Sequence, residues 1–336
     1  MKIGINGFGR IGRLVFRQLF ERTDLPADWK LVQINDPGGD AEQAAHLAEF
    51  DTVQGRWTVP VTGVGDALSV AGREVRFSKG RDAASAAWPE DLDVLIECSG
   101  RFKSSETLAP YLEHGIGHVV VSAPVSDAAI PNIVVGVNDD AFDPQRDRIV
   151  SGASCTTNCV APVVSVLDEA FGLVRGSINT IHAVTASQKV MDGFGADWRR
   201  SRAASASLIP TSTGAAKAIE RIFPQLAGHI SGLAVRVPVT CPSVTDCTFE
   251  LRESTDAEAV NAALRLAAED RLAGILGYET RPLVSVDYVG DRRSSVIDAP
   301  STLVVDGTHV KLLAWYDNEA GYSNRLIDLL RRVGAR

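Results

Sequence analysis

The chain has 336 residues, of which 45% are apolar and 23% charged, and it contains 29 glycines and 15 prolines. This composition is typical of a folded globular protein and excludes intrinsic disorder and collagen-like repeats, while the length favours two domains. The net charge of −8 leaves no basic excess to hold a phosphate backbone. We therefore expect no nucleic acid among its partners.

Signals for membranes and secretion are also missing from the sequence. No run reaches about 18 apolar residues, the length of a membrane-spanning helix. The first residues lack the charged-then-apolar pattern of a signal peptide. The five cysteines are a low, odd number, which is typical of free thiols in a reducing compartment. We expect a cytoplasmic protein with no membrane partner.

The first half of the chain predicts alternating strands and helices. Residues 2–5 form a short apolar strand, and a glycine-rich turn leads into an amphipathic helix that ends near residue 21, before a second strand at 30–34. This order requires parallel strands with a right-handed crossover. Further along we expect strands at 94–97, 119–122, 133–137 and 149–151, a helix at 105–114 and hairpin strands within 58–77.

The pattern changes after residue 155, where a helix over about 156–171 precedes long strands. Apolar and polar residues alternate at 244–252 and 303–315, and Asp306-Gly307 predicts a hairpin turn near the start of the latter segment. Such alternation is typical of antiparallel strands covered on one face. The last helix is expected at 321–333 and the domain boundary near residue 150.

Three glycines in the first turn have the spacing of a dinucleotide-binding loop. Gly7 permits a tight turn, Gly9 lets a pyrophosphate approach the backbone, and Gly12 lets the helix pack on the strand. The helix offers its positive end to phosphate. Asp36 ends the second strand, where a carboxylate accepts hydrogen bonds from a ribose diol. This context favours dinucleotide binding over a plain structural turn.

Cys155 lies in the segment SGASCTTNC, directly before an apolar helix. A helix N-terminus lowers the pKa of a thiol, and the polar neighbours argue against a buried core cysteine, so we expect Cys155 to be reactive. Cys159 lies one turn later among apolar residues, where the core interpretation is favoured. No further Cys or His has ligand spacing nearby, so we expect no metal.

His182 follows an apolar strand at 177–181 and is a candidate base for a thiol, although a histidine in this setting is more often structural. A group of arginines and hydroxyl side chains follows, which either binds phosphate oxygens or forms a solvated basic face. Its members are Thr185, Arg199, Arg200, Arg202, Arg236 and the segment PTSTG at 210–214.

Five segments resemble phosphorylating glyceraldehyde-3-phosphate dehydrogenase, and the resemblance extends along essentially the whole chain. They are INGFGRIGR, SCTTNC, PTSTGAAKA, LAVRVPV and WYDNEAGYSNR. The resemblance implies an α/β protein with an N-terminal Rossmann domain (1–150), completed by the C-terminal helix (319–336), and an α+β catalytic domain (151–318) with a mainly antiparallel sheet. It also implies NAD as cofactor, NADP as a secondary one, and a homotetramer in which the loop 183–206 approaches a neighbour's cofactor.

The same resemblance assigns roles by position. Cys155 is the expected nucleophile and His182 the base, in an oxidation of glyceraldehyde 3-phosphate through a thioester that inorganic phosphate then attacks. The expected cofactor contacts are Gly7, Gly9, Arg10, Ile11, Gly12, Asp36, Arg81, Ser122 and Asn318. Of these, Asn318 is similar to the residue that orients the nicotinamide amide. The expected contacts to the substrate or acceptor phosphate are Ser154, Thr156, Thr185, Arg200, Thr213, Gly214 and Arg236.

Two features of the sequence depart from the family pattern. Ala320 stands where the family commonly has tryptophan, and Pro37-Gly38-Gly39 resembles some dual-cofactor plastid enzymes. The segments GDAEQAAHLAEFD, NIVVGVND and LAGILGYETRPLVSVDY resemble a branch encoded in arsenic-resistance operons. That resemblance implies arsenate as acceptor and 1-arseno-3-phosphoglycerate as a product exported by a partner permease.

Two other functions stay open at this point. Erythrose-4-phosphate dehydrogenase is a relative that shares the Cys and His, but Thr213-Gly214 favours an acceptor-phosphate site. The second alternative is a catalytically silent relative with a regulatory or nucleic-acid-binding role. The intact Cys155 and His182 and the net charge of −8 argue against it.

Overall fold

The computed structural model describes residues 1–334, which form two compact units. The first unit contains residues 1–133, 139–153 and 323–334, and the second contains 134–138 and 154–322. The final two residues of the segment expected as a helix, 335 and 336, lie outside the described residues. Within the described part, no helix is both long and apolar enough to cross a membrane.

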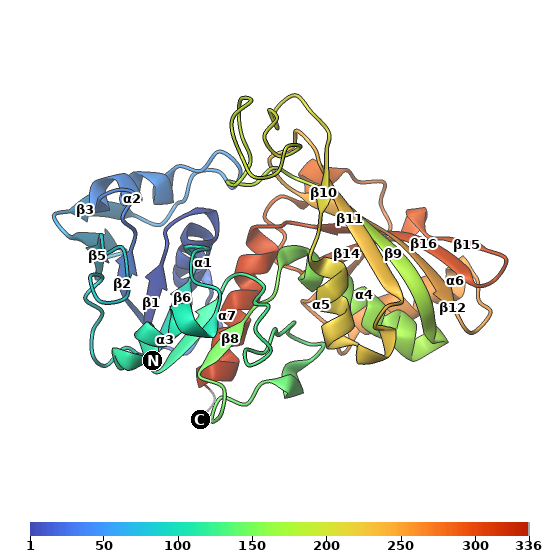
Figure 1. Ribbon diagram of the computed structural model, residues 1–336, viewed down its shortest axis with the longest axis horizontal. Helices are drawn as coiled ribbons and strands as arrows, with labels where there is room; N and C mark the ends of the chain where they lie inside the picture. Colours follow the sequence, from blue (N-terminus) through green and yellow to red (C-terminus); the bar gives the residue numbers. More distant parts are fainter. Residues whose placement is uncertain (335–336) are drawn as a thin grey trace. The chain divides into compact units, whose positions relative to one another are not determined.

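The first unit is built on one sheet (Figure 1). Its strands are β1 (Lys2–Asn6), β2 (Lys30–Asn35), β3 (Val61–Val64), β4 (Ala67–Val70), β5 (Arg73–Ser78), β6 (Val94–Glu97), β7 (His118–Val121) and β8 (Ile149–Ser151). They lie in the order β3-β4-β5-β2-β1-β6-β7-β8, and the strands from β5 to β8 pair in parallel. This is the strand order of doubly wound dinucleotide-binding folds, which bind their ligand where the order reverses, here at β1.

The helical segments of the first unit are α1 (Arg10–Glu21), α2 (Ala41–Glu49), α3 (Ser105–Glu113), η1 (Asp139–Ala141) and, from residue 323 on, α7 (Ala320–Gly334). The sequence prediction missed α2, although its start carries a capping box. Asp40 Oδ1 accepts the Gln43 N–H at 2.9 Å, and Gln43 Oε1 accepts the Asp40 N–H at 3.3 Å. The acidic residue followed three positions later by Gln was the available signal.

The strand expected at 133–137 was wrong. Ile133 and Val134 are buried, but this segment contributes to no strand of the described residues and turns at Gly136, where φ is +85°. A short apolar run indicates burial and does not determine whether the backbone pairs in a sheet.

The second unit also contains a large sheet. Its strands are β9 (Leu173–His182), β10 (Ile209–Ser212), β11 (Ile230–Arg236), β12 (Ser243–Leu251), β13 (Leu276–Glu279), β14 (Ser295–Asp298), β15 (Leu303–Val305) and β16 (His309–Tyr316). The order is β10-β11-β9-β12-β16-β14-β13, with β15 paired to β16. The expectation of a mainly antiparallel sheet is corrected: β9 and β11 pair in parallel, as do β13 and β14, so the sheet is mixed. Alternation in a sequence indicates one covered face but not the direction of the neighbouring strand.

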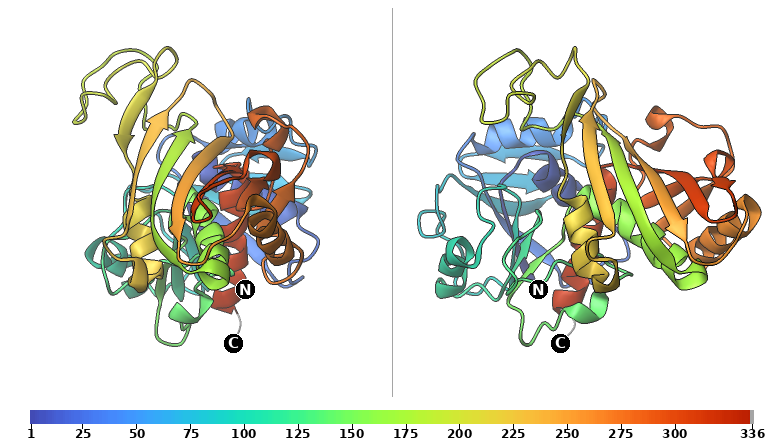
Figure 2. Two further views of the ribbon diagram at one scale, coloured as in Figure 1. Left: turned by 90° about the vertical axis from the view of Figure 1, so that its right-hand side faces the viewer. Right: turned by 45° about the vertical axis from the view of Figure 1, so that its right-hand side comes forward.

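The helical segments of the second unit are α4 (Cys155–Phe171), α5 (Ala215–Ile222), α6 (Ala257–Glu269), η2 (Pro224–Leu226), η3 (Ser285–Tyr288) and η4 (Ala299–Ser301). The helix α4 contacts β9, β12, β14 and β16 and lies against the sheet (Figure 2). The predicted hairpin turn is confirmed, because Asp306 and Gly307 have φ values of +49° and +75° between β15 and β16.

Candidate active site

A cavity of about 380 Å³ lies in the first unit at the carboxyl ends of β1, β2 and β6. It is therefore placed where the strand order reverses, as the fold class predicts. The residues that line it are Asn6, Gly7, Gly9, Asp36, Pro37, Gly38, Gly80, Arg81, Asp82, Cys98, Ser99, Arg101, Phe102 and Tyr111.

The three glycines of the turn before α1 differ in what surrounds them. Gly7 has φ +93°, and a Cβ there would collide with the backbone of Ser99. A Cβ on Gly12 would collide with the Gly7 carbonyl. A Cβ on Gly9 would meet no heavy atom of the described residues within 4 Å. Packing therefore requires Gly7 and Gly12, whereas the space above Gly9 is open for a pyrophosphate to approach the start of α1.

Asp36 is fixed by two backbone donors. Its Oδ2 accepts the Phe8 N–H at 2.6 Å and its Oδ1 accepts the Gly38 N–H at 2.8 Å. Each oxygen retains a further lone pair for a ribose hydroxyl. Of the other expected cofactor contacts, Arg81 lines the cavity; those outside its lining are Arg10, Ile11, Gly12, Ser122 and Asn318. The Arg10 side chain pairs with the buried carboxylate of Asp51.

The sequence reasoning missed Ser99 and Tyr111, which line the cavity and surround a buried carboxyl group. Glu97 accepts hydrogen bonds from the Ser99 N–H at 2.7 Å, the Tyr111 hydroxyl at 3.2 Å and the Asn6 amide at 2.5 Å. Burial raises the pKa of Glu97. The available sequence signal was the position of Ser99 just after β6. The carboxyl ends of neighbouring parallel strands lie at the same edge of the sheet, so a residue there is expected near the cavity.

Cys155 and His182 are brought together in the second unit, although they are 27 positions apart in the sequence. Cys155 is the first residue of α4, which Ser154 caps by accepting the Thr157 N–H at 3.0 Å. His182 is the last residue of β9 and is buried. The distance between Cys155 Sγ and His182 Nε2 is 3.6 Å. A strand end and a helix start therefore place a thiol beside an imidazole.

Two groups contact Nδ1 of the His182 ring. The Ala183 carbonyl oxygen, 2.7 Å away, can only accept, whereas the Arg236 guanidinium, whose Nη1 also contacts Nδ1, can only donate. In the tautomer that carries its proton on Nδ1 and donates it to Ala183, the lone pair of Nε2 faces the Cys155 sulfur. Burial and the nearby charge of Arg236 lower the pKa of His182 to about 3, so the ring is neutral at physiological pH. A neutral imidazole in this tautomer can accept a proton at Nε2.

The start of α4 lowers the pKa of Cys155 as expected, but burial outweighs that effect. Burial raises the pKa of the Cys155 thiol, and the positive charge of Arg236 and the hydrogen bonds from the start of α4 offset only part of the rise. The site therefore favours a neutral thiol beside a neutral imidazole.

Cys159 is a core residue, as predicted. It is buried and lies 3.4 Å from Thr245 Oγ1 and 3.5 Å from Ser295 Oγ, and burial raises its pKa to about 12. Within residues 1–334 all the cysteines are free thiols.

Two of the predicted anion-binding arginines lie near His182. Arg236 Nη1 contacts His182 Nδ1 and donates to the Ala183 oxygen at 3.1 Å. Arg200 Nε donates to Thr211 Oγ1 at 2.8 Å, and its charge also lowers the pKa of His182. By contrast, Arg202 pairs with Asp192 on the surface, and its neighbour Arg199 is also exposed.

Two hydroxyl residues of the predicted anion sites, Thr213 and Thr185, form hydrogen bonds to residues two positions further along the chain. Thr213 Oγ1 accepts the Ala215 N–H at 3.2 Å beside Gly214, which begins α5. Thr185 Oγ1 lies 3.0 Å from Ser187 Oγ.

Tyr316 was missed as a site residue, although the segment WYDNEAGYSNR contains it. Its buried hydroxyl lies 3.0 Å from Thr156 Oγ1 and 2.8 Å from Thr180 Oγ1. Its ring meets the His182 ring edge to face, with centroids 6.0 Å apart. Tyr316 thus connects the residue after the thiol with the strand that carries the imidazole. The available sequence signals were its place in that segment and its position at the end of an alternating strand.

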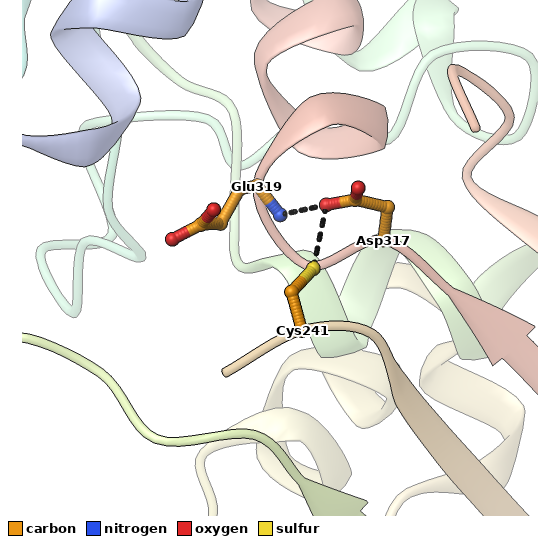
Figure 3. A group of neighbouring side chains, drawn as sticks. All are labelled: Cys241, Asp317 and Glu319. Carbon is orange, nitrogen blue, oxygen red and sulfur yellow. Dashed lines mark hydrogen bonds between the residues drawn. The ribbon is translucent and has the colours of Figure 1, made fainter. Parts of the chain in front are cut away.

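One group of described residues has the composition of a metal site, which the sequence analysis did not expect. The ligand atoms of Cys241, Asp317 and Glu319 lie within 4.8 Å of one another (Figure 3). The Asp317 carboxylate is occupied by protein donors, however. Its Oδ1 accepts the Cys241 thiol at 3.1 Å and the N–H groups of Glu319 and Ala320, each at 2.8 Å. These bonds identify Asp317 as the cap of α7.

Comparison with known proteins agrees with this geometry. Residues 1–105 match the NAD binding domain of glyceraldehyde 3-phosphate dehydrogenase, and residues 154–318 match its C-terminal domain. Among similar proteins, glyceraldehyde-3-phosphate dehydrogenase 3 of a Nostoc species is 49% identical, with 99% of this chain and 98% of the relative covered. The enzyme of Geobacillus stearothermophilus is 47% identical, with 100% and 99% covered. Glyceraldehyde-3-phosphate dehydrogenase 1 of Bacillus subtilis is 45% identical, with the same coverage. The chain belongs to the glyceraldehyde-3-phosphate dehydrogenase family.

Proposed function

We propose that this protein is an NAD-dependent glyceraldehyde-3-phosphate dehydrogenase that forms 1,3-bisphosphoglycerate through a thioester on Cys155. The observation that carries the proposal is the 3.6 Å approach of Cys155 Sγ to His182 Nε2, with Nδ1 bonded to the Ala183 carbonyl. This arrangement places the lone pair of His182 Nε2, the proposed base, toward the sulfur of Cys155, the proposed nucleophile. The open surface above Gly9 and the fixed Asp36 support NAD as the cofactor.

The reaction proceeds in two stages at these residues. His182 Nε2 takes the proton of the Cys155 thiol, the sulfur bonds to the aldehyde carbon as the C=O π bond opens, and the imidazolium returns the proton to the carbonyl oxygen to give a thiohemiacetal. As that hydroxyl loses its proton to the neutral His182, hydride leaves the same carbon and a thioester remains; NAD, when bound, would supply the hydride acceptor. Inorganic phosphate then attacks the thioester carbon, the carbon–sulfur bond breaks, and the acyl phosphate is released. Covalent catalysis divides one difficult step into two easier ones.

Two anion sites are needed, and the predicted residues supply donors for both. Arg200, Arg236 and Thr185 are the proposed contacts to the phosphate of the substrate. The proposed contacts to the acceptor are Ser154, Thr156, Thr213 and Gly214, where the start of α5 offers a helix N-terminus. The decisive experiment is NADH formation from glyceraldehyde 3-phosphate with and without inorganic phosphate, with trapping of the acyl group on Cys155. Phosphate-independent hydrolysis would support the erythrose-4-phosphate alternative instead.

A finer proposal is that arsenate serves as the acceptor in arsenic detoxification. Phosphate and arsenate share charge and tetrahedral shape, so hydroxyl and backbone donors should hardly distinguish them. We expect kcat/KM for the two acceptors to agree within about tenfold, or about 1.4 kcal/mol. Because this ratio alone does not reveal the cellular role, the neighbouring genes are the second test. Glycolytic neighbours without an arsenic-resistance permease would contradict the detoxification role.

We also propose a cytoplasmic homotetramer. The loop expected at a subunit interface exposes large apolar side chains, among them Val190, Met191, Phe194 and Trp198. Apolar side chains gathered in this way on a surface are typical of protein interaction sites.

A further inference from the structure

A buried serine connects the segment after His182 with Asn318. Ser243 is the first residue of β12 and is 1% exposed. Its Oγ accepts the Ala183 N–H at 3.0 Å and donates to Asn318 Oδ1 at 2.9 Å. Ala183 is also the residue whose carbonyl bonds His182 Nδ1, at 2.7 Å. The Ser243 hydroxyl group therefore bonds both Ala183, the residue after the proposed base His182, and Asn318, the proposed contact to the nicotinamide.

The directions of these bonds fix the orientation of the Asn318 side chain. A backbone N–H can only donate, so the serine oxygen accepts from Ala183 and its own proton is available to Asn318 Oδ1. With Oδ1 turned toward Ser243, the amide presents Nδ2 on its other side. Asn318 has no other side-chain hydrogen bond to the described residues. Its two N–H donors are thus available to an acceptor such as the carbonyl group of a carboxamide.

The same segment holds the backbone of Asn318 from a second point. Cys241, two positions before Ser243, donates its thiol proton to Asp317 Oδ1 at 3.1 Å (Figure 3). Asp317 Oδ2 accepts the Gly290 N–H at 2.8 Å. Residues 241 and 243 therefore contact residues 317 and 318 through side-chain hydrogen bonds. This restricts both the position of the Asn318 backbone and the rotation of its amide.

We propose that Ser243 is a positioning residue, which orients the Asn318 amide so that Nδ2 faces the carbonyl oxygen of the nicotinamide carboxamide. The inference rests on the proposed role of Asn318 in binding NAD. Its physical basis is that an amide has a donor end and an acceptor end, and that only the donor end matches a carbonyl oxygen. Without the serine hydroxyl, the amide could turn and present oxygen to oxygen, which repels.

The test is a double-mutant cycle of Ser243→Ala and Asn318→Ala. The dissociation constant for NAD is measured for each variant by calorimetric titration of the full-length protein. We expect Ser243→Ala to weaken NAD binding about tenfold in the wild-type background, but less than about twofold when Asn318→Ala is already present. Thr245→Val is the matched control, since it removes another buried hydroxyl from β12 whose bonds lie within the core. We expect the control to leave NAD affinity within about twofold of wild type.

Additive effects of Ser243→Ala and Asn318→Ala, or an equal loss of affinity in Thr245→Val, would overturn the proposal. Ser243→Cys provides a second variant of similar shape with a weaker donor, and it should bind NAD with intermediate affinity. Thionicotinamide adenine dinucleotide gives an independent readout: its C=S group accepts hydrogen bonds poorly, so Ser243→Ala should weaken it less than NAD. These are binding measurements, so they decide the role of Ser243 even if the protein fails to oxidise glyceraldehyde 3-phosphate.

Discussion

The two cysteines near the start of α4 differ in their surroundings although they lie one helical turn apart. Cys155 faces the imidazole of His182, whereas Cys159 is enclosed by core residues that raise its pKa to about 12. A thiol must become a thiolate to react, so only the first has a base within reach. Position on the helix therefore separates the proposed nucleophile from a structural thiol.

We expect Cys155→Ser to lower kcat by roughly 1000-fold or more, because the covalent intermediate can no longer form. Cys159→Ser should retain most of the activity. NADH formation is the measurement for both variants, and peptide mapping after iodoacetamide treatment of the native protein locates the reactive thiol. Activity that survives in Cys155→Ser, or labelling mainly at Cys159, would show that the wrong cysteine has been assigned.

Arg236 links the protonation of Cys155 to that of His182, the proposed nucleophile and base. Its positive charge lowers the pKa of the Cys155 thiol and also lowers the pKa of His182. Removing the charge in Arg236→Met should raise both pKa values. Because alkylation requires the thiolate, the midpoint of the pH profile for iodoacetamide reaction should move to higher pH. Arg202→Met removes a surface arginine and is the control; a profile that moves equally in both variants would contradict a local effect of Arg236.

The two hydrogen bonds that hold Asp36 favour NAD over NADP. The 2′-phosphate of NADP would bring nearly two negative charges beside the carboxylate. At about 4 Å and an effective dielectric near 20, each charge is opposed by about 4 kcal/mol, which screening reduces to about 1–3 kcal/mol. The Pro37-Gly38-Gly39 segment opposes this preference only if Asp36 moves, which would break its bonds to Phe8 and Gly38. We expect kcat/KM to favour NAD by roughly ten- to hundredfold; equal values in steady-state kinetics at matched salt would show that Asp36 does not discriminate.

At the scale of the elements, the aspartate caps of α6 and α7 differ in what each of them supports. Asp256 caps α6 by accepting the Ala259 N–H at 2.8 Å on an exposed surface. Asp317 caps α7 and also accepts the Cys241 thiol and the Gly290 N–H. The first cap stabilises a helix, and the second also fixes the backbone next to Asn318.

Alanine substitutions should separate these two roles. Asp256→Ala should lower the free energy of unfolding by about 1 kcal/mol and leave NAD affinity unchanged. Asp317→Ala should lower it by about 2–4 kcal/mol, because buried donors lose their acceptor, and should also weaken NAD binding. Urea unfolding and NAD titration measure the two quantities. Unchanged NAD affinity in a folded Asp317→Ala variant would contradict the link between the cap and Asn318.

At the scale of the whole molecule, the net charge of −8 and the exposed apolar loop act in opposite directions on self-association. Trp198 is 89% exposed in the single chain and Phe194 is fully exposed, so their burial in an assembly would be strongly favourable. Charge repulsion spread over the surface is screened within about 8 Å at physiological salt. Association is therefore expected to prevail.

Light scattering should give the wild-type protein a mass about four times that of one chain. The double variant Phe194→Ser with Trp198→Ser should dissociate into smaller species, because about 150–250 Å² of apolar surface per aromatic side chain would no longer be buried. Leu266→Ser, which changes an exposed apolar residue of α6, is the control and should remain tetrameric. A monomeric wild type, or a double variant that stays tetrameric, would contradict the proposed interface.

The sequence by itself determined the features that depend on local chemistry. The glycine turn before α1, the start of α4 at Cys155 and the Asp306-Gly307 hairpin follow from backbone conformations that few residues adopt and from periodicity along one element. The family-specific motifs identified the family, because their residues are contiguous in the chain.

Only the tertiary structure decided the features that depend on contacts between distant segments. Strand direction in the second sheet, the burial that raises the pKa of Cys155, and the bonds of Tyr316 and Ser243 all arise from residues far apart in the sequence. Periodicity reports which face of an element is covered, but not what covers it. Whether a side chain donates, accepts or loses its charge depends on that neighbour, so the protonation states and orientations at the site are properties of the folded chain.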